Sequence, residues 1–171
     1  FVTCHSYIQS EINMLMHVAD SMGFRINTFT HILEGYKVAD KLREHGAAGS
    51  TFSDWWAYKF EVNDAIPYNG AIMHKQGALT GFNSDDAEMG RRLNQEAAKA
   101  VKYGGVSEEE AWKFVTLNPA KMLHLDDQIG SIKEAPPFCL LAMTLSSIGC
   151  IVLFIYADNI YQLLAPIAGM K

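Results

Sequence analysis

The first 134 residues alternate between short β-rich runs and amphipathic helical stretches, and this order constrains the fold more than any other feature. The predicted strands are residues 1–5, 24–31, 47–52 and 78–83. The predicted helices follow them in turn, over residues 10–22, 36–44, 65–76 and 88–103. Glycines stand where these helices should end, at Gly23, Gly46, Gly77 and Gly104–Gly105. Strands and helices in regular alternation predict an α/β fold with a parallel sheet.

One more helix is predicted after Ser107, because three consecutive glutamates supply a capping box and an acidic first turn. We expect Asn118 and Pro119 to end it. Four βα units with short connections fit half of a (β/α)8 TIM-type barrel better than an open doubly wound sheet. Half a barrel leaves two sheet edges and one face uncovered, so we expect residues 1–134 to be a fragment whose partner strands precede Phe1.

Composition changes sharply near Ala135. Except for Asp158 and Lys171, every Lys, Arg, Asp and Glu lies within residues 1–134. Residues 138–157 carry no charge, and a run of this length is what a helix needs to cross the hydrocarbon layer of a membrane. The chain therefore divides into an α/β part, residues 1–134, and an apolar tail, residues 135–171.

Overall charge and cysteine content narrow the classes of function. The net charge is −5, without a long basic run, so we expect no nucleic-acid partner. Cys4, Cys139 and Cys150 match neither a disulfide framework nor a Cys-x-x-Cys zinc site. With 49% hydrophobic residues, the chain has enough apolar mass to bury a core.

Polar side chains stand where the predicted strands end, which is where parallel α/β folds place their sites. His5 and His31 end the first two strands, and Asp85 follows the fourth. Two imidazoles and a carboxylate suit zinc or a similar divalent ion. Such a carboxylate can also act as a general base toward water whose pKa the ion has lowered. We therefore predict that His5, His31 and Asp85 bind metal and that Asp85 is also catalytic, although a single histidine would more simply be a hydrogen-bonded structural side chain.

Several further residues are candidates for substrate binding. Trp55 and Trp56 lie in the longest loop, where they either shape a substrate pocket or pack on the rim of the fold. Arg91 is suited to meet a substrate carboxylate, with surface ion pairing as the alternative. Tyr7 and Lys37 follow the first and second strand ends and complete this set. None of the remaining histidines stands at a strand end, so we expect no catalytic role for His17, His45, His74 and His124.

Six segments resemble the C-terminal half of the metal-dependent amidohydrolase superfamily, in its imidazolonepropionase-like branch. They are Thr3–Tyr7, Phe29–Lys37, Ser50–Trp56, Asn83–Asp85, Arg91–Asn94 and Thr116–Lys121. The resemblance implies that the histidines of the fifth and sixth barrel strands and the aspartate of the eighth, here His5, His31 and Asp85, bind metal. It also implies that Asp85 takes a proton from the attacking water and passes it to the leaving nitrogen.

The resemblance implies a metal-dependent hydrolase that cleaves carbon–nitrogen bonds other than ordinary peptide bonds, in a small amide or cyclic amide, through metal-activated water. The cofactor would be a divalent metal, with zinc the expected ion, and one or two ions both fit. The first-strand His-x-His pair and the fourth-strand Lys or Glu ligand of the family have no counterpart here, so we expect the chain alone to be inactive. Two alternatives stay open: an inactive or membrane-tethered binding domain derived from the same barrel, and an α/β small-molecule binder without metal.

The tail departs from the family pattern, which continues as Gly-Lys-x-Ala-Asp where this chain has Ala135-Pro136-Pro137. Residues 141–146 can be encoded by a nucleotide sequence that, in another reading frame, encodes Gly-His-Asp-Pro-Leu. This peptide resembles the turn that the family has at the same distance after its Gly-Ser-Ile. We therefore favour a frame slip near Glu134 over a membrane anchor, because no Lys or Arg cluster marks a cytoplasmic side. A buried hydrophobic helix is a third interpretation. The chain is expected to be membrane-associated if the tail is a genuine span, and soluble otherwise.

Overall fold

A computed structural model describes residues 1–53, 57, 59–131 and 137–164. The chain forms two compact units, Phe1–Ser131 and Ile132–Lys171, each of which is described by itself. The predicted division after residue 134 lies within a few residues of this boundary.

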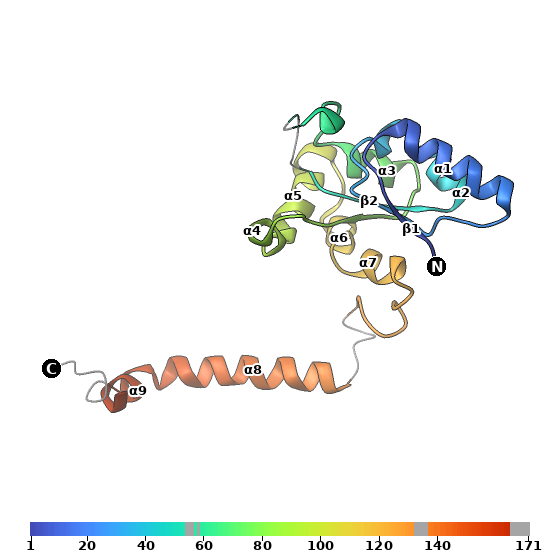
Figure 1. The fold of residues 1–171 in the computed structure, drawn as a ribbon. Coiled ribbons are helices and arrows are strands. Elements are labelled where there is room, and N and C mark those ends of the chain that lie inside the picture. The colour runs from blue at the N-terminus through green and yellow to red at the C-terminus, as the bar shows by residue number, and fades with distance from the viewer. Residues whose placement is uncertain (54–56, 58, 132–136, 165–171) are drawn as a thin grey trace. The chain divides into compact units, whose positions relative to one another are not determined.

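The first unit is built around a parallel sheet of four short strands (Figure 1). They are β1 (Thr3–His5), β2 (Thr28–Thr30), β3 (Ala48–Thr51) and β4 (Thr80–Phe82). The strands pair in chain order, β1-β2-β3-β4, and every pair is parallel. This order has no reversal of the kind that defines a doubly wound sheet. The predicted α/β fold is confirmed, whereas the described strands form an open sheet and do not close a barrel.

Helices follow every strand of this sheet. Their bounds are α1 (Gln9–Met22), η1 (Gly35–Lys37), α2 (Ala39–His45), η2 (Phe60–Val62), α3 (Asn69–Lys75), α4 (Ala87–Gly90), α5 (Leu93–Gly104), α6 (Glu108–Lys113) and α7 (Leu117–Met122). Gly23 and Gly46 end α1 and α2 in the left-handed conformation, with φ of 76° and 82°. This confirms the predicted stop signals, because only glycine adopts such φ values without a steric penalty.

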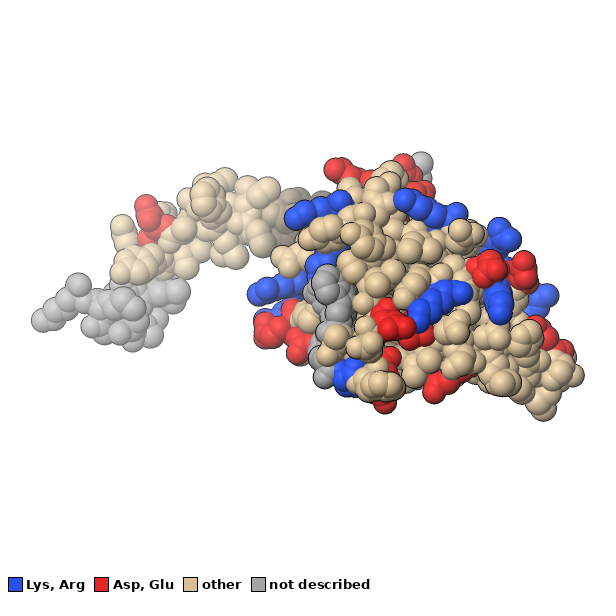
Figure 2. All heavy atoms as spheres, turned by 90° about the horizontal axis from the view of Figure 1, so that it is seen from above, with Lys and Arg blue, Asp and Glu red and all other residues tan. Residues whose placement is uncertain are grey.

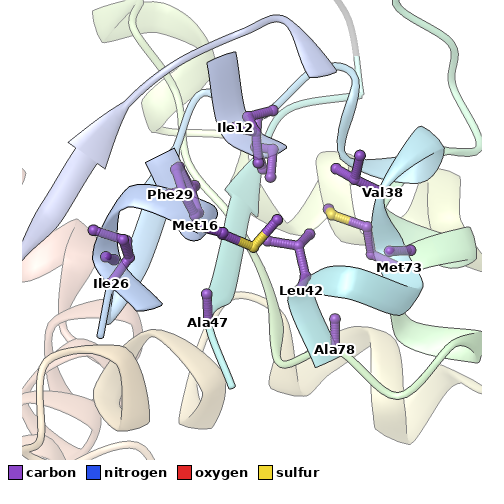
Figure 3. Close-up of a cluster of buried hydrophobic side chains, with 12 residues drawn as sticks. Ile12, Met16, Ile26, Phe29, Val38, Leu42, Ala47, Met73 and Ala78 are labelled. Carbon is purple, nitrogen blue, oxygen red and sulfur yellow. The ribbon is translucent and has the colours of Figure 1, made fainter. Parts of the chain in front are cut away.

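The main hydrophobic core lies between the sheet and the first three helices (Figure 3). Ile12 and Met16 are one helical turn apart on α1 and are both buried in the same cluster as Phe29 of β2. Leu42 of α2 and Met73 of α3 complete the same cluster. The 3.6-residue period of the apolar positions therefore predicts the helix faces that cover the sheet.

A second core lies beside β4, where Phe82 and Phe114 pack edge to face with their ring centroids 5.5 Å apart. The outer edge of β4 is occupied by the same part of the chain. Phe82 donates its backbone N–H to Phe114 O over 2.9 Å, and Asn118 donates from Nδ2 to Thr80 O over 2.7 Å. Residues 114 and 118 therefore bind two backbone groups at this edge of β4.

Several predicted helix bounds were wrong, and three of the differences have a local cause. The helix over residues 88–103 divides into α4 and α5, because Arg92 between them leaves the helical conformation (φ −123°, ψ 28°). Pro119 does not end a helix but lies in the first turn of α7, where a missing N–H leaves no helical hydrogen bond unmade. The helix over residues 65–76 begins only at Asn69, since Pro67 disfavours a helical conformation at Ile66.

The described part of the second unit, residues 137–164, forms two helices, α8 (Pro137–Ile155) and α9 (Ala157–Leu164). By length and composition alone α8 is able to cross a membrane, with a mean hydropathy of 2.5, and none of its side chains is buried. Frame slip and membrane anchor both stay predictions. Figure 2 shows that the first unit, in contrast, carries acidic and basic side chains interspersed over the visible face.

Candidate functional site

The structure brings together the three residues predicted to bind metal. His5 ends β1, His31 follows β2 and Asp85 follows β4, so all three leave the sheet at its carboxyl edge. The His5 and His31 rings have their centroids 4.4 Å apart and an interplanar angle of 52°. His31 donates from Nε2 to Asp85 Oδ1 over 2.6 Å. Two imidazoles and a carboxylate thus form one contiguous cluster.

The backbone of His31 is in the left-handed region, with φ of 59°. Residues other than glycine seldom adopt this conformation, which costs of order 1–3 kcal/mol and persists only where the surrounding structure enforces it. Here Leu33 donates to His31 O over 2.8 Å, and Ile32 donates to Ser50 O over 3.2 Å. His124, which does not stand at a strand end, has a similar conformation (φ 57°), so the backbone of His31 supports a functional role only together with its place in the cluster.

The chemistry of the cluster fits a divalent ion, although its arrangement is not that of a formed metal site. Nδ1 of His31 is buried and has no hydrogen-bond partner among the described residues, which is unusual for a polar atom inside a protein. In the part of the chain that the structure describes, no three His, Cys, Asp or Glu side chains surround a common point as metal ligands. Instead, His31 Nε2 and Asp85 Oδ1 bind one another directly.

Aromatic side chains line the histidine pair. The Tyr7 ring packs edge-on against His5 at 4.8 Å, and the Phe52 ring contacts His31 at 5.3 Å. Lys59 Nζ lies 4.2 Å from the centroid of the Tyr7 ring. Tyr7 was among the predicted substrate residues, whereas Phe52 was missed because an apolar residue at the end of a predicted strand indicates core packing.

Among the described residues, no recorded interaction joins Lys37 or Arg91, two further predicted substrate residues, to the cluster. Lys37 Nζ forms ion pairs with Asp64 Oδ2 at 2.5 Å and with Glu34 Oε2 at 3.3 Å. The hydrogen bond between Lys37 and Asp64 raises the pKa of Lys37 and lowers the pKa of Asp64. Arg91 forms an exposed ion pair with Glu88. Trp55 and Trp56 lie outside the described residues. A substrate-binding role for these four residues stays a prediction.

Two of the remaining histidines have structural hydrogen bonds. His45 is buried, with Nδ1 bonded to Asp20 Oδ1 at 2.8 Å and Nε2 accepting from Ile26 N at 3.0 Å. His124 Nε2 lies 2.6 Å from Asn27 Oδ1, which connects the segment after α7 to the segment before β2. Both contacts explain the residues without catalysis.

The chain is thus a parallel α/β protein with two histidines and an aspartate grouped at the carboxyl ends of its strands. Comparison with known proteins identifies its family. The sequence model of the amidohydrolase family matches residues 69–171, which is more than half of the chain. The chain therefore belongs to the amidohydrolase family. Asp85 lies within the matched region, and His5 and His31 precede it.

A solved structure gives a second, independent likeness. The crystal structure of an amidohydrolase from Thermotoga maritima MSB8 is 28% identical in sequence and superimposes with a TM-score of 0.65. The match covers 76% of this chain and 34% of that protein, so the chain spans about one third of the length of the Thermotoga amidohydrolase. No curated protein matches the sequence.

Proposed function

We propose that this chain forms part of a metal-dependent hydrolase that cleaves a carbon–nitrogen bond, other than an ordinary peptide bond, in a small amide or cyclic amide. We also propose that the chain belongs to the imidazolonepropionase-like branch and that its four strands are the C-terminal half of a TIM-type barrel. The observation that carries it is the cluster of His5, His31 and Asp85 at one edge of a parallel sheet, in a chain of the amidohydrolase family.

His5, His31 and Asp85 are the residues that would hold the divalent ion, for which zinc is the expected identity. When bound, such an ion lowers the pKa of a water molecule and polarises the amide carbonyl. The aromatic rings of Tyr7 and Phe52 contact the two imidazoles, of which His5 is exposed and His31 has a side chain that is only 15% exposed.

Asp85 is suited to move the proton during hydrolysis. Its side chain is 43% exposed, so it is accessible to a substrate, and His31 Nε2 holds one carboxylate oxygen in place. The carboxylate takes a proton from the attacking water and then gives it to the leaving nitrogen, which converts a poor leaving group into a neutral amine. In the metal-free chain the hydrogen bond from His31 Nε2 orients this carboxylate, and the same nitrogen cannot donate to Asp85 while it ligates a metal ion.

Zinc binding by the full chain tests the proposal. We expect calorimetric titration to show a zinc site that is lost in His31→Ala and Asp85→Asn and kept in His124→Ala, whose imidazole binds Asn27 instead. Hydrolysis of N-acyl amino acids and cyclic amides is then measured in the complete polypeptide, where Asp85→Asn should abolish turnover. Absence of zinc binding, or binding that neither substitution weakens, would contradict the proposal.

A further inference from the structure

We infer that Asn69 is a positioning residue for His31, an inference whose catalytic meaning rests on the proposed function. Asn69 is the first residue of α3 and is only 1% exposed. Its side-chain amide takes part in three hydrogen bonds. Oδ1 accepts from Tyr36 N at 2.8 Å, and Nδ2 donates to Ile32 O at 2.7 Å and to Thr51 Oγ1 at 2.9 Å.

The partners of Asn69 bracket the turn that follows His31. Ile32 is the next residue along the chain, and Tyr36 lies at the far end of the turn, so one amide group fixes both ends. Thr51 ends β3 and ties this amide to the sheet. The left-handed backbone of His31 needs such external support, because a free turn would relax to a negative φ.

Packing and hydrogen bonding act together at this turn. Gly35, within the turn, lies so close to Met73 of α3 that a Cβ atom there would overlap the Met73 sulfur. The turn therefore docks directly on the helix that begins with Asn69. Close docking excludes water from the Asn69 amide, which leaves no solvent to replace a lost hydrogen bond.

Asparagine is chemically suited to this position because it presents a donor group and an acceptor on the same planar amide. An aspartate carboxylate has the same shape but no donor, so its oxygens would face the Ile32 carbonyl. A serine is too short to keep all three partners. We expect either substitution to free the turn, to let His31 leave the left-handed region and to move its imidazole away from Asp85.

Asn118 provides a matched control. It is also a buried asparagine, 7% exposed, and it lies in the first turn of another helix, α7. Its Nδ2 donates to a backbone carbonyl, Thr80 O, over 2.7 Å. Asn118→Asp therefore removes the same kind of buried hydrogen bond as Asn69→Asp, but from a strand rather than from the His31 turn.

The experiment observes His31 in the full chain, labelled with ¹⁵N-histidine and free of metal. In the native chain we expect Nε2 to carry the proton and its signal to be shifted downfield and protected from exchange, because Nε2 donates to Asp85. His31→Gln assigns this signal. Asn69→Asp should abolish it, whereas Asn118→Asp should keep it. Zinc affinity should fall by about tenfold or more in Asn69→Asp alone, which is the usual effect of losing a residue that orients a ligand.

Each outcome separates the positioning role from a general loss of stability. A protected His31 signal in Asn69→Asp would overturn the inference. Loss of the signal in both Asn69→Asp and Asn118→Asp, in proportion to the loss of unfolding free energy in each variant, would also overturn it. Asn69→Ser removes the same anchor without adding a charge and replaces Asn69→Asp if that variant does not fold. If the native chain binds no zinc but the metal-free result is as expected, the proposed function fails while the positioning of His31 by Asn69 stands.

Discussion

His31 and Asp85 are 54 positions apart in the chain, yet a hydrogen bond of 2.6 Å joins His31 Nε2 to Asp85 Oδ1. The two residues follow β2 and β4, which do not pair with each other because β3 lies between them. The hydrogen bond therefore spans the carboxyl edge of the sheet above β3. This edge is where parallel α/β folds assemble residues from separate strands into one site.

The left-handed backbone of His31 leads to a prediction about stability. We expect His31→Val to be about 1–2 kcal/mol less stable than His31→Asn, because asparagine tolerates positive φ and a β-branched residue does not. Both variants lose the imidazole, so the difference isolates the backbone. Urea unfolding measures it.

The same pair of substitutions at His17 serves as the control. His17 is exposed on α1, where valine and asparagine have similar helix propensities, so the two variants should differ little. An equally small difference at His31 would show that its conformation carries no strain.

Glu96 of α5 is predicted to stabilise the segment after β3. Its buried carboxylate accepts from Ser53 N at 2.7 Å and from Ser53 Oγ at 2.6 Å, and Lys99 lies 2.8 Å away. Glu96→Ala removes these hydrogen bonds to a buried carboxylate, and we expect a loss of about 2–4 kcal/mol in the free energy of unfolding. Glu109→Ala, which removes an exposed partner of Lys113, should cost no more than about 0.5 kcal/mol. Similar costs for the two variants would refute the assigned role of Glu96.

Much of the fold is predictable from the sequence because its signals are local. The strand and helix order follows from short-range periodicity, and Gly23 and Gly46 end helices for a reason confined to their own backbone. The break before α5 was missed although Gly90 ends α4, because a single glycine within a helical pattern is compatible with an unbroken helix. Asp86 caps α4 by accepting from Glu88 N and Met89 N.

The candidate site is predictable only in part. His5, His31 and Asp85 stand out because they are polar residues at strand ends, and parallel strands bring their carboxyl ends to one edge. Asn69 carries no such signal, since its partners lie 18 to 37 positions away and are set by how α3 docks on the sheet. The left-handed conformation of His31 is likewise a product of tertiary contacts.

The ion pair of Lys37 and Asp64 makes a prediction about pH. The hydrogen bond from Lys37 is the main reason why the pKa of Asp64 is lowered, so Lys37→Met should raise that pKa toward its ordinary value. A lowered carboxyl pKa adds stability above the ordinary carboxyl pKa, and this contribution disappears as the pH falls through the lowered value. The native chain should therefore lose this contribution in acid, whereas the variant lacks it throughout.

Carboxyl ¹³C titration of Asp64 measures this effect directly. Lys41→Met is the control, because Lys41 binds the Asn13 amide oxygen and not a carboxylate. An unchanged Asp64 titration in Lys37→Met would mean that the ion pair does not persist in solution.

Close packing of α5 against α3 makes the last prediction, which concerns two glycines. A Cβ atom at Gly104 would overlap the Cβ of Ala71 on α3, and neither atom has a rotamer through which to move away. Gly104→Ala should therefore lower the free energy of unfolding by about 1–3 kcal/mol, because the two helices must separate.

A Cβ atom at Gly90, at the end of α4, meets no atom within 4 Å. Gly90→Ala should raise stability by as much as about 1 kcal/mol, since alanine loses less backbone entropy in a helix. Urea unfolding of both variants measures the two opposite signs, and a stabilising Gly104→Ala would mean that α3 and α5 are not in close contact.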